Sequence, residues 1–411
     1  MSAEPCKNTA QHSRPAEPVL VINTGSSTIK YQLLEVTGAE GKRLASGLLD
    51  RIGDPGSRLV HRAVGHDDLV DEKPVADHEA GFRAVLSAFE RTGMPAQLSA
   101  VGHRVVHGGV RFDGPVLVHD DVLATIRELT PLAPLHNPAN ALGIEVTRRL
   151  YPDLPQVAVF DTAFHRTMPA RAYRYALPRE LADRYGIRRF GFHGTSHQYV
   201  SRRAAEHLGR PLEELALITL HLGNGASAAA VAGGRCIDTS MGLTPLAGLV
   251  MGTRSGDVDP AVVFHLHREA GLGFDEIETL LTKQSGLVGL AGAGDVGEIR
   301  ARIAAGDTDA AEALDIFCYR VRGYVGAYAA ALGRVDAIVF TAGIGENDPA
   351  IRAAVCEGLA GYGVVLDAER NTAAVAGARA VSVDDARVPV LVVPTDEELE
   401  IARQTLAVAS G

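Results

Sequence analysis

Arginine, histidine or aspartate side chains occur in five short segments of this 411-residue chain, and three of these segments also contain glycine. Each segment follows an apolar run that predicts a β-strand, and α/β proteins bind their ligands beyond the ends of strands. Guanidinium and imidazole groups are suited to anions, because a guanidinium offers two parallel donors to a carboxylate or phosphate. The five segments are residues 102–109, 135–138, 160–165, 189–197 and 251–257.

Three other segments have the composition of phosphate-binding loops. A β-branched run ends at Asn23 in a Gly-Ser-Ser-Thr turn, and a second strand-like run covers residues 29–36. Small hydroxyl side chains and backbone N–H groups hold a polyphosphate without a clash. Residues 221–227 lie between two predicted strands, and residues 342–349 lie between a strand and a helix that begins with proline. A Gly-Ser turn alone closes many hairpins, but the three segments together indicate nucleotide chemistry.

Each charged candidate also has an ordinary interpretation. Arg104 or Arg254 can be a surface charge or half of an ion pair, and Asp161 can be a helix cap. Glu397 stands in the first turn of a predicted helix, where the helix dipole alone favours an acid. His193 can be a partly buried, hydrogen-bonded histidine. These interpretations do not explain why such residues recur at successive strand ends.

The common phosphate, hydrolase and zinc motifs are excluded. The chain has neither G-x-x-x-x-G-K-[ST] nor G-x-S-x-G. Residues 292–297 match G-x-G-x-x-G, but no strand precedes them, so we expect a flexible loop. The pairs His103/His107 and His193/His197 have the i, i+4 spacing of zinc ligands on a helix. They lie among glycine and β-branched residues without the acid of H-E-x-x-H, so no zinc site is expected.

Composition describes an ordinary globular protein. The apolar content is 46% and the net charge is −10, which disfavours nucleic acids and anionic membranes as partners. No apolar run approaches the roughly 20 residues that span a bilayer. Residues 1–18 predict a disordered tail and not a signal peptide. Cys6, Cys236, Cys318 and Cys356 form no Cys-x-x-Cys pair. We therefore expect a cytoplasmic protein in a reducing compartment.

The length predicts two domains, and the order of elements is repeated. The first half predicts a strand hairpin and then a strand at 43–49, a helix at 79–91, a strand at 98–106, helices at 122–129 and 139–150, and a strand at 156–160. The second half predicts strands at 215–222, 226–231 and 235–238, helices at 261–270 and 315–332, a strand at 337–340, a helix at 349–359 and a strand at 388–393. A last helix at 395–408 opens with Thr395 and Glu398 in a capping-box arrangement. Two halves with the same order of strands and helices predict a duplicated fold with a ligand cleft between the domains.

These segments together resemble the acetate kinase family, within the superfamily that joins acetate and sugar kinases to heat-shock chaperone ATPases and actin. The motifs are V-I-N-x-G-S-S, G-H-R-V-V-H-G-G, L-A-P-L-H-N-P, F-D-T-A-F-H, F-G-F-H-G-T-S-H, L-G-N-G-A-S, M-G-T-R-S-G-D-V-D-P and A-G-I-G-E-N. The resemblance runs from about Val19 to the last helix. It implies two duplicated RNase H-like (actin-like ATPase) α/β domains with a βββαβαβα core, one formed by residues 19–161 plus 398–411 and the other by residues 162–397.

The resemblance implies reversible phosphoryl transfer from ATP to acetate, which gives ADP and acetyl phosphate. The implied cofactor is Mg²⁺, with Mn²⁺ as a substitute, and the implied assembly is a homodimer through the second domain. Such a transfer needs in-line alignment and neutralisation of the γ-phosphoryl oxygens more than covalent chemistry. Acetate is already an anion at neutral pH, so no general base is required.

The resemblance also assigns residues. Arg104 and Arg254 would hold the carboxylate and the transferring phosphoryl group, His193 would donate to the transition state, His136 would assist, and Asp161 would orient the acetate or magnesium end. Asn23 and Glu397 would position Mg²⁺. The implied methyl pocket consists of Val106, Leu135, Phe192 and Pro245. The implied ATP-binding residues are Ser26, Ser27, Thr28, Lys30, His221, Gly223, Asn224, Gly225, Gly343, Ile344, Gly345, Glu346 and Asn347.

Three alternatives remain at this point. A propionate kinase shares nearly all of these motifs, and a small apolar pocket separates the two acids by only about 1–3 kcal/mol per methylene. An actin-like or chaperone-like ATPase would need neither the two arginines nor the methyl pocket. A nucleotide-binding protein without catalysis would leave the charged candidates unexplained. Thr28 departs from the commoner serine of the family but keeps a hydroxyl donor.

Overall fold

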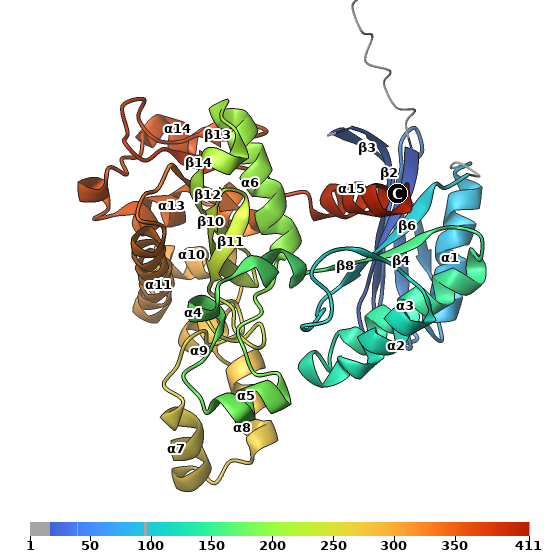
Figure 1. The fold of residues 1–411 in the computed structure, drawn as a ribbon, viewed down its shortest axis with the longest axis horizontal. Coiled ribbons are helices and arrows are strands. Elements are labelled where there is room, and N and C mark those ends of the chain that lie inside the picture. Colours follow the sequence, from blue (N-terminus) through green and yellow to red (C-terminus); the bar gives the residue numbers. More distant parts are fainter. Residues whose placement is uncertain (1–16, 39, 94–96, 411) are drawn as a thin grey trace, which may run out of the picture.

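The computed structural model describes residues 17–38, 40–93 and 97–410, which form two lobes, each built on one mixed β-sheet (Figure 1). Most of the predicted tail, with Cys6, lies outside the described residues. Its last two residues do not, since Glu17 and Pro18 already belong to the first strand. No helix within the described ranges is long and apolar enough to cross a membrane.

The N-terminal lobe is an eight-stranded sheet in the order β5-β4-β3-β2-β1-β6-β8-β7. Its strands are β1 (Glu17–Thr24), β2 (Ile29–Thr37), β3 (Glu40–Asp50), β4 (Arg58–Ala63), β5 (Leu69–Glu72), β6 (Ala100–Val105), β7 (Val116–Leu117) and β8 (Gln156–Phe160). The helices of this lobe are α1 (His78–Arg91), α2 (Asp120–Glu128), α3 (Asn137–Leu150) and the C-terminal α15 (Glu397–Ala409).

The C-terminal lobe is a six-stranded sheet in the order β11-β10-β9-β12-β14-β13. Its strands are β9 (Ala216–Leu222), β10 (Ala226–Ala232), β11 (Arg235–Thr239), β12 (Ala337–Thr341), β13 (Arg379–Ala380) and β14 (Val390–Val392). Its helices are α4 (Ala170–Tyr173), α5 (Arg179–Tyr185), α6 (Gly194–Leu208), α7 (Ala261–Glu269), α8 (Phe274–Lys283), α9 (Gly286–Ala291), α10 (Val296–Ala304), α11 (Thr308–Leu332), α12 (Ala342–Asn347), α13 (Pro349–Cys356) and α14 (Ala368–Thr372).

The two sheets share one topology, which confirms the predicted duplication. In the first lobe β3, β2 and β1 are antiparallel neighbours, and β6 and β8 follow in parallel. In the second lobe β11, β10 and β9 are antiparallel, and β12 and β14 follow in parallel. The β9–β10 hairpin thus occupies in its lobe the position of the β1–β2 hairpin in the other.

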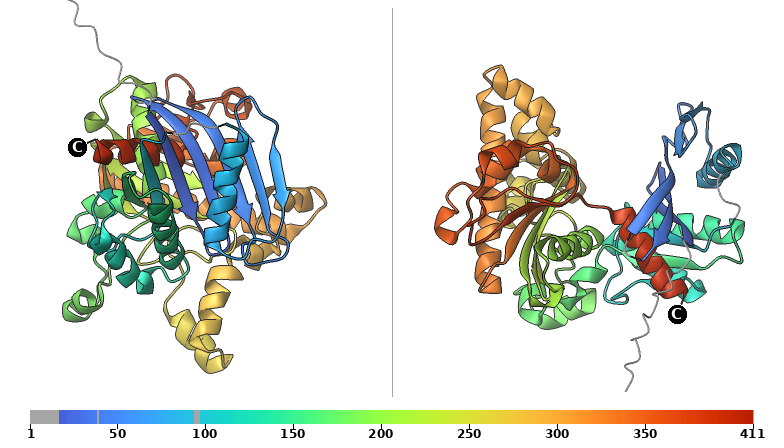
Figure 2. Two further views of the ribbon diagram at one scale, coloured as in Figure 1. Left: turned by 90° about the vertical axis from the view of Figure 1, so that its right-hand side faces the viewer. Right: turned by 90° about the horizontal axis from the view of Figure 1, so that it is seen from above.

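The lobes meet through α6 and α15, which pack against each other. Figure 2 shows α15 lying against the blue strands of the N-terminal sheet after the chain has crossed over from the other lobe. A continuous apolar cluster joins the two lobes, with Val21 and Ile401 on one side and Val200 and Leu217 on the other. The ion pair between Arg202 and Glu400 crosses the same interface.

Several sequence-based expectations about local structure were wrong. The helix α6 was missed because its first turn, Gly-Thr-Ser-His, has poor helix propensity and was interpreted only as a loop. The strands β4 and β5 and the helices α8 to α10 were also missed. The expected capping box at Thr395 does not form, because Asp396 is the N-cap and accepts a hydrogen bond from the Leu399 amide. The exact domain boundaries stay a prediction.

Candidate active site

Arg104 lies at the end of β6 and is clamped by Asp161 at the end of the neighbouring β8. Its Nε and Nη2 donate to the two carboxylate oxygens of Asp161 at 3.0 and 2.7 Å. The carboxylate is buried, and its negative charge raises the pKa of the guanidinium above its ordinary value. The fork that we expected to grip acetate is therefore occupied, and Nη1 is the part of the guanidinium left for a ligand.

Two buried asparagines of α3 fix the loops beside this pair. Asn137 and Asn140 accept hydrogen bonds from the backbone amides of His107 and Val106. Asn140 also donates to the carbonyl of Thr24, at the start of the first hairpin. The helix therefore ties the loop after β6 to the loop after β1.

His193 precedes α6 in a left-handed backbone conformation, with φ 55° and ψ 25°. A non-glycine residue in this region is strained, and such strain gathers at functional sites. The amide of Gly194 donates to the carbonyl of Asp161 at 2.9 Å, so β8 of the other lobe anchors the start of this helix. The ring stacks on His221, with 4.2 Å between the centroids.

His193 and Arg254 converge on the loop between β9 and β10. A Cβ atom added to Gly225 would lie 2.8 Å from Nη2 of Arg254 and 3.5 Å from Nε2 of His193. A side chain at position 225 would therefore displace the Arg254 guanidinium from its place against the loop. Arg254 donates to the carbonyl of Pro245 at 2.7 Å and has no carboxylate partner among the described residues. Burial lowers its pKa.

The histidines of this region are held neutral. Burial lowers the pKa of His193 well below its ordinary value, and the nearby positive charges of Arg104 and Arg254 lower it further. Desolvation, followed by the charge of Arg104, also lowers the pKa of His136; Asp161 opposes this shift and Arg254 adds a smaller part to it. Both rings are thus within electrostatic reach of the two arginines, and they act at neutral pH as hydrogen-bonding groups and not as cations.

The four residues expected to surround a methyl group differ in exposure. Val106 and Phe192 are buried in one apolar cluster, although they come from different lobes. Pro245 is partly buried and accepts the hydrogen bond from Arg254. Leu135 is 64% exposed, so it does not close the pocket in this structure.

The first hairpin presents exposed hydroxyls and borders a group of acids. Ser26 and Ser27 are exposed. Asn23 pairs across the hairpin with Lys30, whose ammonium lies 2.5 Å from Glu398. Burial raises the pKa of Glu397 to about 7, with a further contribution from Asp161 and Glu398 and an opposing one from Arg104. A cation would relieve this crowding of carboxylates. Within the described ranges, no three His, Cys, Asp or Glu residues form a ready-made metal cage.

The expected nucleotide loops line a cavity of about 560 Å³. Gly223 and Asn224 come from the β9–β10 loop, and Gly343, Ile344 and Asn347 come from α12. Residues 294–297, which we expected to be an unrelated flexible loop, line the same cavity, and Asp295 caps α10. The G-x-G-x-x-G pattern of residues 292–297 could have indicated this position. It was set aside because no strand precedes it, as a dinucleotide-binding motif requires.

Glu346 holds the start of α12 in place through its carboxylate. Its Oε1 accepts from the amides of Ala342 and Thr395 at 2.8 and 3.1 Å. The buried Arg352 donates to the carbonyls of Gly345 and Glu346. These bonds fix the start of α12 and tie it to the chain segment that leads into α15.

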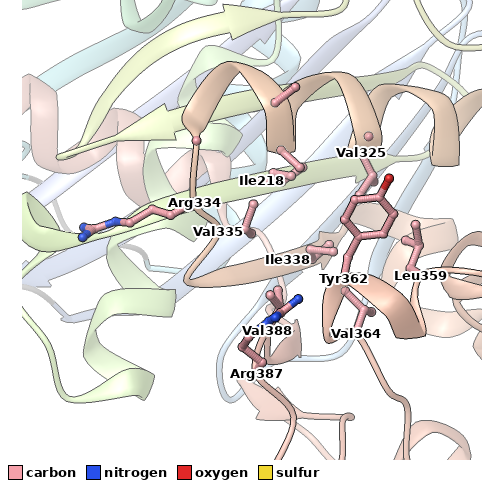
Figure 3. Close-up of a pocket in the computed structure, with 14 residues that line it drawn as sticks. Ile218, Val325, Arg334, Val335, Ile338, Leu359, Tyr362, Val364, Arg387 and Val388 are labelled. Atoms are coloured by element: carbon pink, nitrogen blue, oxygen red, sulfur yellow. The ribbon is translucent and has the colours of Figure 1, made fainter.

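A second cavity of about 560 Å³ contains none of the predicted site residues. It lies at the C-terminal end of α11, above β9 and β12, where Val325, Ile338 and Val388 form an apolar lining (Figure 3). Arg334 and Arg387 also border it. Cavity size alone therefore does not locate the site, whereas the gathering of charged side chains does.

Sequence reasoning missed the residues that hold the catalytic candidates in place. Ser227 contacts the rings of both His193 and His197, and Asn140 joins two ligand loops. The i, i+4 spacing of His193 and His197 does bring the two imidazoles together, but they share a serine hydroxyl. His103 lies on a strand and bonds Gln156 at 2.7 Å.

Comparison with known proteins supports a family assignment. A sequence model described as the Acetokinase family matches residues 18–403. The chain is 57% identical to an acetate kinase of Streptomyces coelicolor over 396 residues, which cover 95% of this chain and 97% of that protein. It superposes on the crystal structure of Porphyromonas gingivalis acetate kinase with a TM-score of 0.91 and 44% identity, covering 96% and 100% of the two chains. A propionate kinase from Francisella tularensis gives a TM-score of 0.89 at 40% identity, covering 94% and 98%. The chain belongs to the acetokinase family.

Proposed function

We propose that this chain catalyses reversible, Mg²⁺-dependent transfer of the γ-phosphoryl group of ATP to acetate. The observation that carries the proposal is the convergence of His193 and Arg254 on Gly225, in the loop whose Gly223 and Asn224 line the cavity proposed for the nucleotide. Two donors that converge on one loop can stabilise charge on the oxygens of a phosphoryl group in transit.

The proposed roles follow from the contacts. Arg254 has no carboxylate partner among the described residues, so its charge is available to the migrating phosphoryl group. Arg104 is held rigid by Asp161 and offers Nη1 to the acetate carboxylate. Asp161 is then a positioning residue for Arg104. His193 donates from Nε2 as a neutral ring, and His136 assists from the acetate side.

The residues present fit a nucleotide and a magnesium ion. We propose that Gly223, Asn224 and Gly225 contact the phosphates, together with Ser26, Ser27 and Thr28 of the facing hairpin. Mg²⁺ is usually bound by one or two carboxylates and by substrate phosphates. Glu397, which is crowded by other acids, suits that arrangement, and we propose that Asn23 at the end of β1 assists it. When bound, the metal would neutralise phosphate charge.

The preferred acyl acceptor is proposed to be acetate, with propionate as a secondary substrate. Val106 and Phe192 form a closed apolar wall, whereas the exposed Leu135 leaves the opposite side open. A wall of this kind discriminates by about 1–3 kcal/mol per methylene. We also propose that the protein is a homodimer. We propose a cytoplasmic location, because free thiols such as the buried Cys236, Cys318 and Cys356 are typical of a reducing compartment.

The test is an assay of ADP release with ATP and a series of carboxylates, in which hydroxylamine traps the acyl phosphate. We expect turnover that depends on acetate, falls with propionate, and stops when Mg²⁺ is removed and resumes when it is restored. ATP hydrolysis that is indifferent to the carboxylate would overturn the proposal in favour of a non-metabolic ATPase. A preference for propionate would reassign the acyl acceptor.

A further inference from the structure

A buried chain of hydrogen bonds leads away from His193 into the C-terminal lobe. Its Nδ1 lies 2.9 Å from Oγ of Ser227, and the same oxygen lies 2.8 Å from Nε2 of His197. Nδ1 of His197 lies 2.7 Å from Oγ1 of Thr219. Ser227, His197 and Thr219 are fully buried, so these contacts are shielded from bulk solvent.

The geometry gives the chain a direction. Thr219 has one proton and two acceptors within reach, namely His197 at 2.7 Å and the carbonyl of Ala229 at 3.5 Å. If Nδ1–H of His197 donated to Thr219 instead, the threonine proton would be left with only the Ala229 carbonyl at 3.5 Å, which is too long for a good O–H···O hydrogen bond. Thr219 is therefore assigned as the donor to Nδ1 of His197. A neutral imidazole that accepts at Nδ1 carries its proton at Nε2. His197 therefore donates to Ser227.

The next step fixes the proton on His193. Because Ser227 accepts from His197, its own proton has Nδ1 of His193 as its acceptor. His193 then carries its proton on Nε2, the atom that faces Arg254 and the glycine loop. The opposite arrangement, with Nδ1–H of His193 donating to Ser227, would leave Nε2 as an acceptor and repel a phosphoryl oxygen.

We propose that Ser227 is a positioning residue that, with His197 and Thr219, fixes His193 as the Nε2–H tautomer and so makes it a phosphoryl donor. This inference rests on the proposed function. The low pKa values of His193 and His197, which burial produces, agree with two neutral rings. His165, whose ring lies edge-on to that of His197 with 5.7 Å between the centroids, is also neutral because burial lowers its pKa to about 4.

The experiment compares Ser227→Ala with Ser227→Thr, which keeps the hydroxyl, and with Ser201→Ala as a matched control. Ser201 is a buried serine of α6 whose hydroxyl donates to the backbone carbonyl of His197 and not to its ring. Loss of one preorganised donor lowers kcat by about 10²–10³-fold, and a mixed tautomer is a partial loss. We expect kcat to fall about 10–100-fold in Ser227→Ala with little change in either KM. Ser227→Thr should recover most of this loss, and Ser201→Ala should retain full turnover.

A double-mutant comparison separates this role from general damage. If Ser227 acts only through His193, then His193→Ala and His193→Ala/Ser227→Ala should have equal kcat values, because the second change has nothing left to orient. Additive losses would overturn the inference.

The tautomer itself is read by long-range ¹H–¹⁵N correlation of ¹⁵N-histidine-labelled protein, with His193 assigned by its loss in His193→Ala. We expect a protonated Nε2 and an unprotonated Nδ1 in the unaltered protein, and averaged shifts in Ser227→Ala. A protonated Nδ1 or a cationic ring in the unaltered protein would overturn the inference even if Ser227→Ala failed to fold. This measurement needs no turnover. Absence of acetate-dependent activity would therefore contradict the proposed function, whereas the tautomer assignment would still be decided by the NMR result alone.

Discussion

Arg104 and Arg254 bring the same charge into one site but stand in opposite energetic situations. Arg104 is paired through two hydrogen bonds with a carboxylate that is only 3% exposed. Arg254 is desolvated without a carboxylate among the described residues, which its lowered pKa reflects. A buried charge without a partner opposes folding, and it persists where function requires it.

Replacing each arginine with alanine should therefore have different effects on stability. Arg254→Ala should lower kcat about 10³-fold or more, because a transition-state guanidinium is lost, while the free energy of unfolding stays equal or rises. Arg104→Ala should also remove activity, but it leaves the Asp161 carboxylate buried and unpaired and should lower the free energy of unfolding by about 3–5 kcal/mol. Urea denaturation and initial-rate assays of both variants check this.

The paired control is Arg104→Ala/Asp161→Asn, in which the stranded carboxylate is neutralised. It should recover part of the lost stability without recovering activity. Equal destabilisation by the two single alanine replacements would contradict the distinction between a paired and an unpaired guanidinium.

At the scale of elements, the contact between α6 and α15 determines how the two lobes are joined. Arg202 on α6 reaches Glu400 on α15, which is 1% exposed, and Gln404 donates to the same carboxylate at 2.9 Å. The hydroxyl groups of Ser196 and Thr395 lie 2.8 Å apart, nearer to the N-terminal ends of the two helices. The helix α6, which begins just after His193, is thus joined at several points to α15, which begins at Glu397.

We predict that Arg202→Met destabilises the protein by about 3–5 kcal/mol, because it leaves Glu400 buried and charged. The double variant Arg202→Met/Glu400→Gln should recover most of this loss, since a neutral amide can still bond Gln404. Thermal unfolding of the three proteins measures the effect. If the double variant were as unstable as the single one, the loss would come from packing and not from a stranded charge.

Elements that carry their own local signal were predictable. The β1–β2 and β9–β10 hairpins, α3 and β8 follow from apolar periodicity and turn residues, and β8 was predicted with its observed bounds. The helix α6 was not, because its first turn is stabilised by contacts with the other lobe, such as the bond from Gly194 to Asp161. Local propensity contains no information about such a contact.

The same division applies to the candidate site. Arg104, Asp161, His193 and Arg254 could be named as candidates because arginine, histidine and aspartate at predicted strand ends stand out in the sequence. Their partnerships were not, because the Arg104–Asp161 clamp joins residues 57 positions apart. The role of Ser227 could not be predicted for the same reason, since its hydroxyl lies between two rings that only the folded chain brings together.

At the scale of the whole molecule, buried neutral histidines in both lobes make the stability of the protein depend on pH. His103, between Gln156 and Thr147, and His107 lie inside the N-terminal lobe, and His165 lies beside Cys236 in the other. Burial is the largest cause that lowers the pKa of each to about 4. In the unfolded chain these groups titrate near their ordinary value of 6.5.

The direction of the resulting pH dependence follows. Above about pH 6.5 neither state is protonated at these rings, so they have no effect on stability. Between pH 6.5 and the folded value near 4, the unfolded chain binds protons that the native protein does not, so stability falls as the pH falls. Each group lowers the free energy of unfolding by up to about 1.4 kcal/mol per pH unit, so the three together lower it by up to about 4 kcal/mol per pH unit.

Urea denaturation at half-unit steps from pH 7.5 to 5 should show this loss, because the three rings outweigh Glu397, whose raised pKa of about 7 stabilises the native state as the pH falls. Carboxylates with ordinary pKa values near 4 contribute little in this range. The variant His103→Asn removes one titrating ring and keeps a side chain that can hydrogen-bond Gln156. Its slope should be shallower than that of the unaltered protein by about one proton. A midpoint that stays constant down to pH 5 would contradict this, because it would require that the buried rings accept protons in the native state as readily as in the unfolded chain.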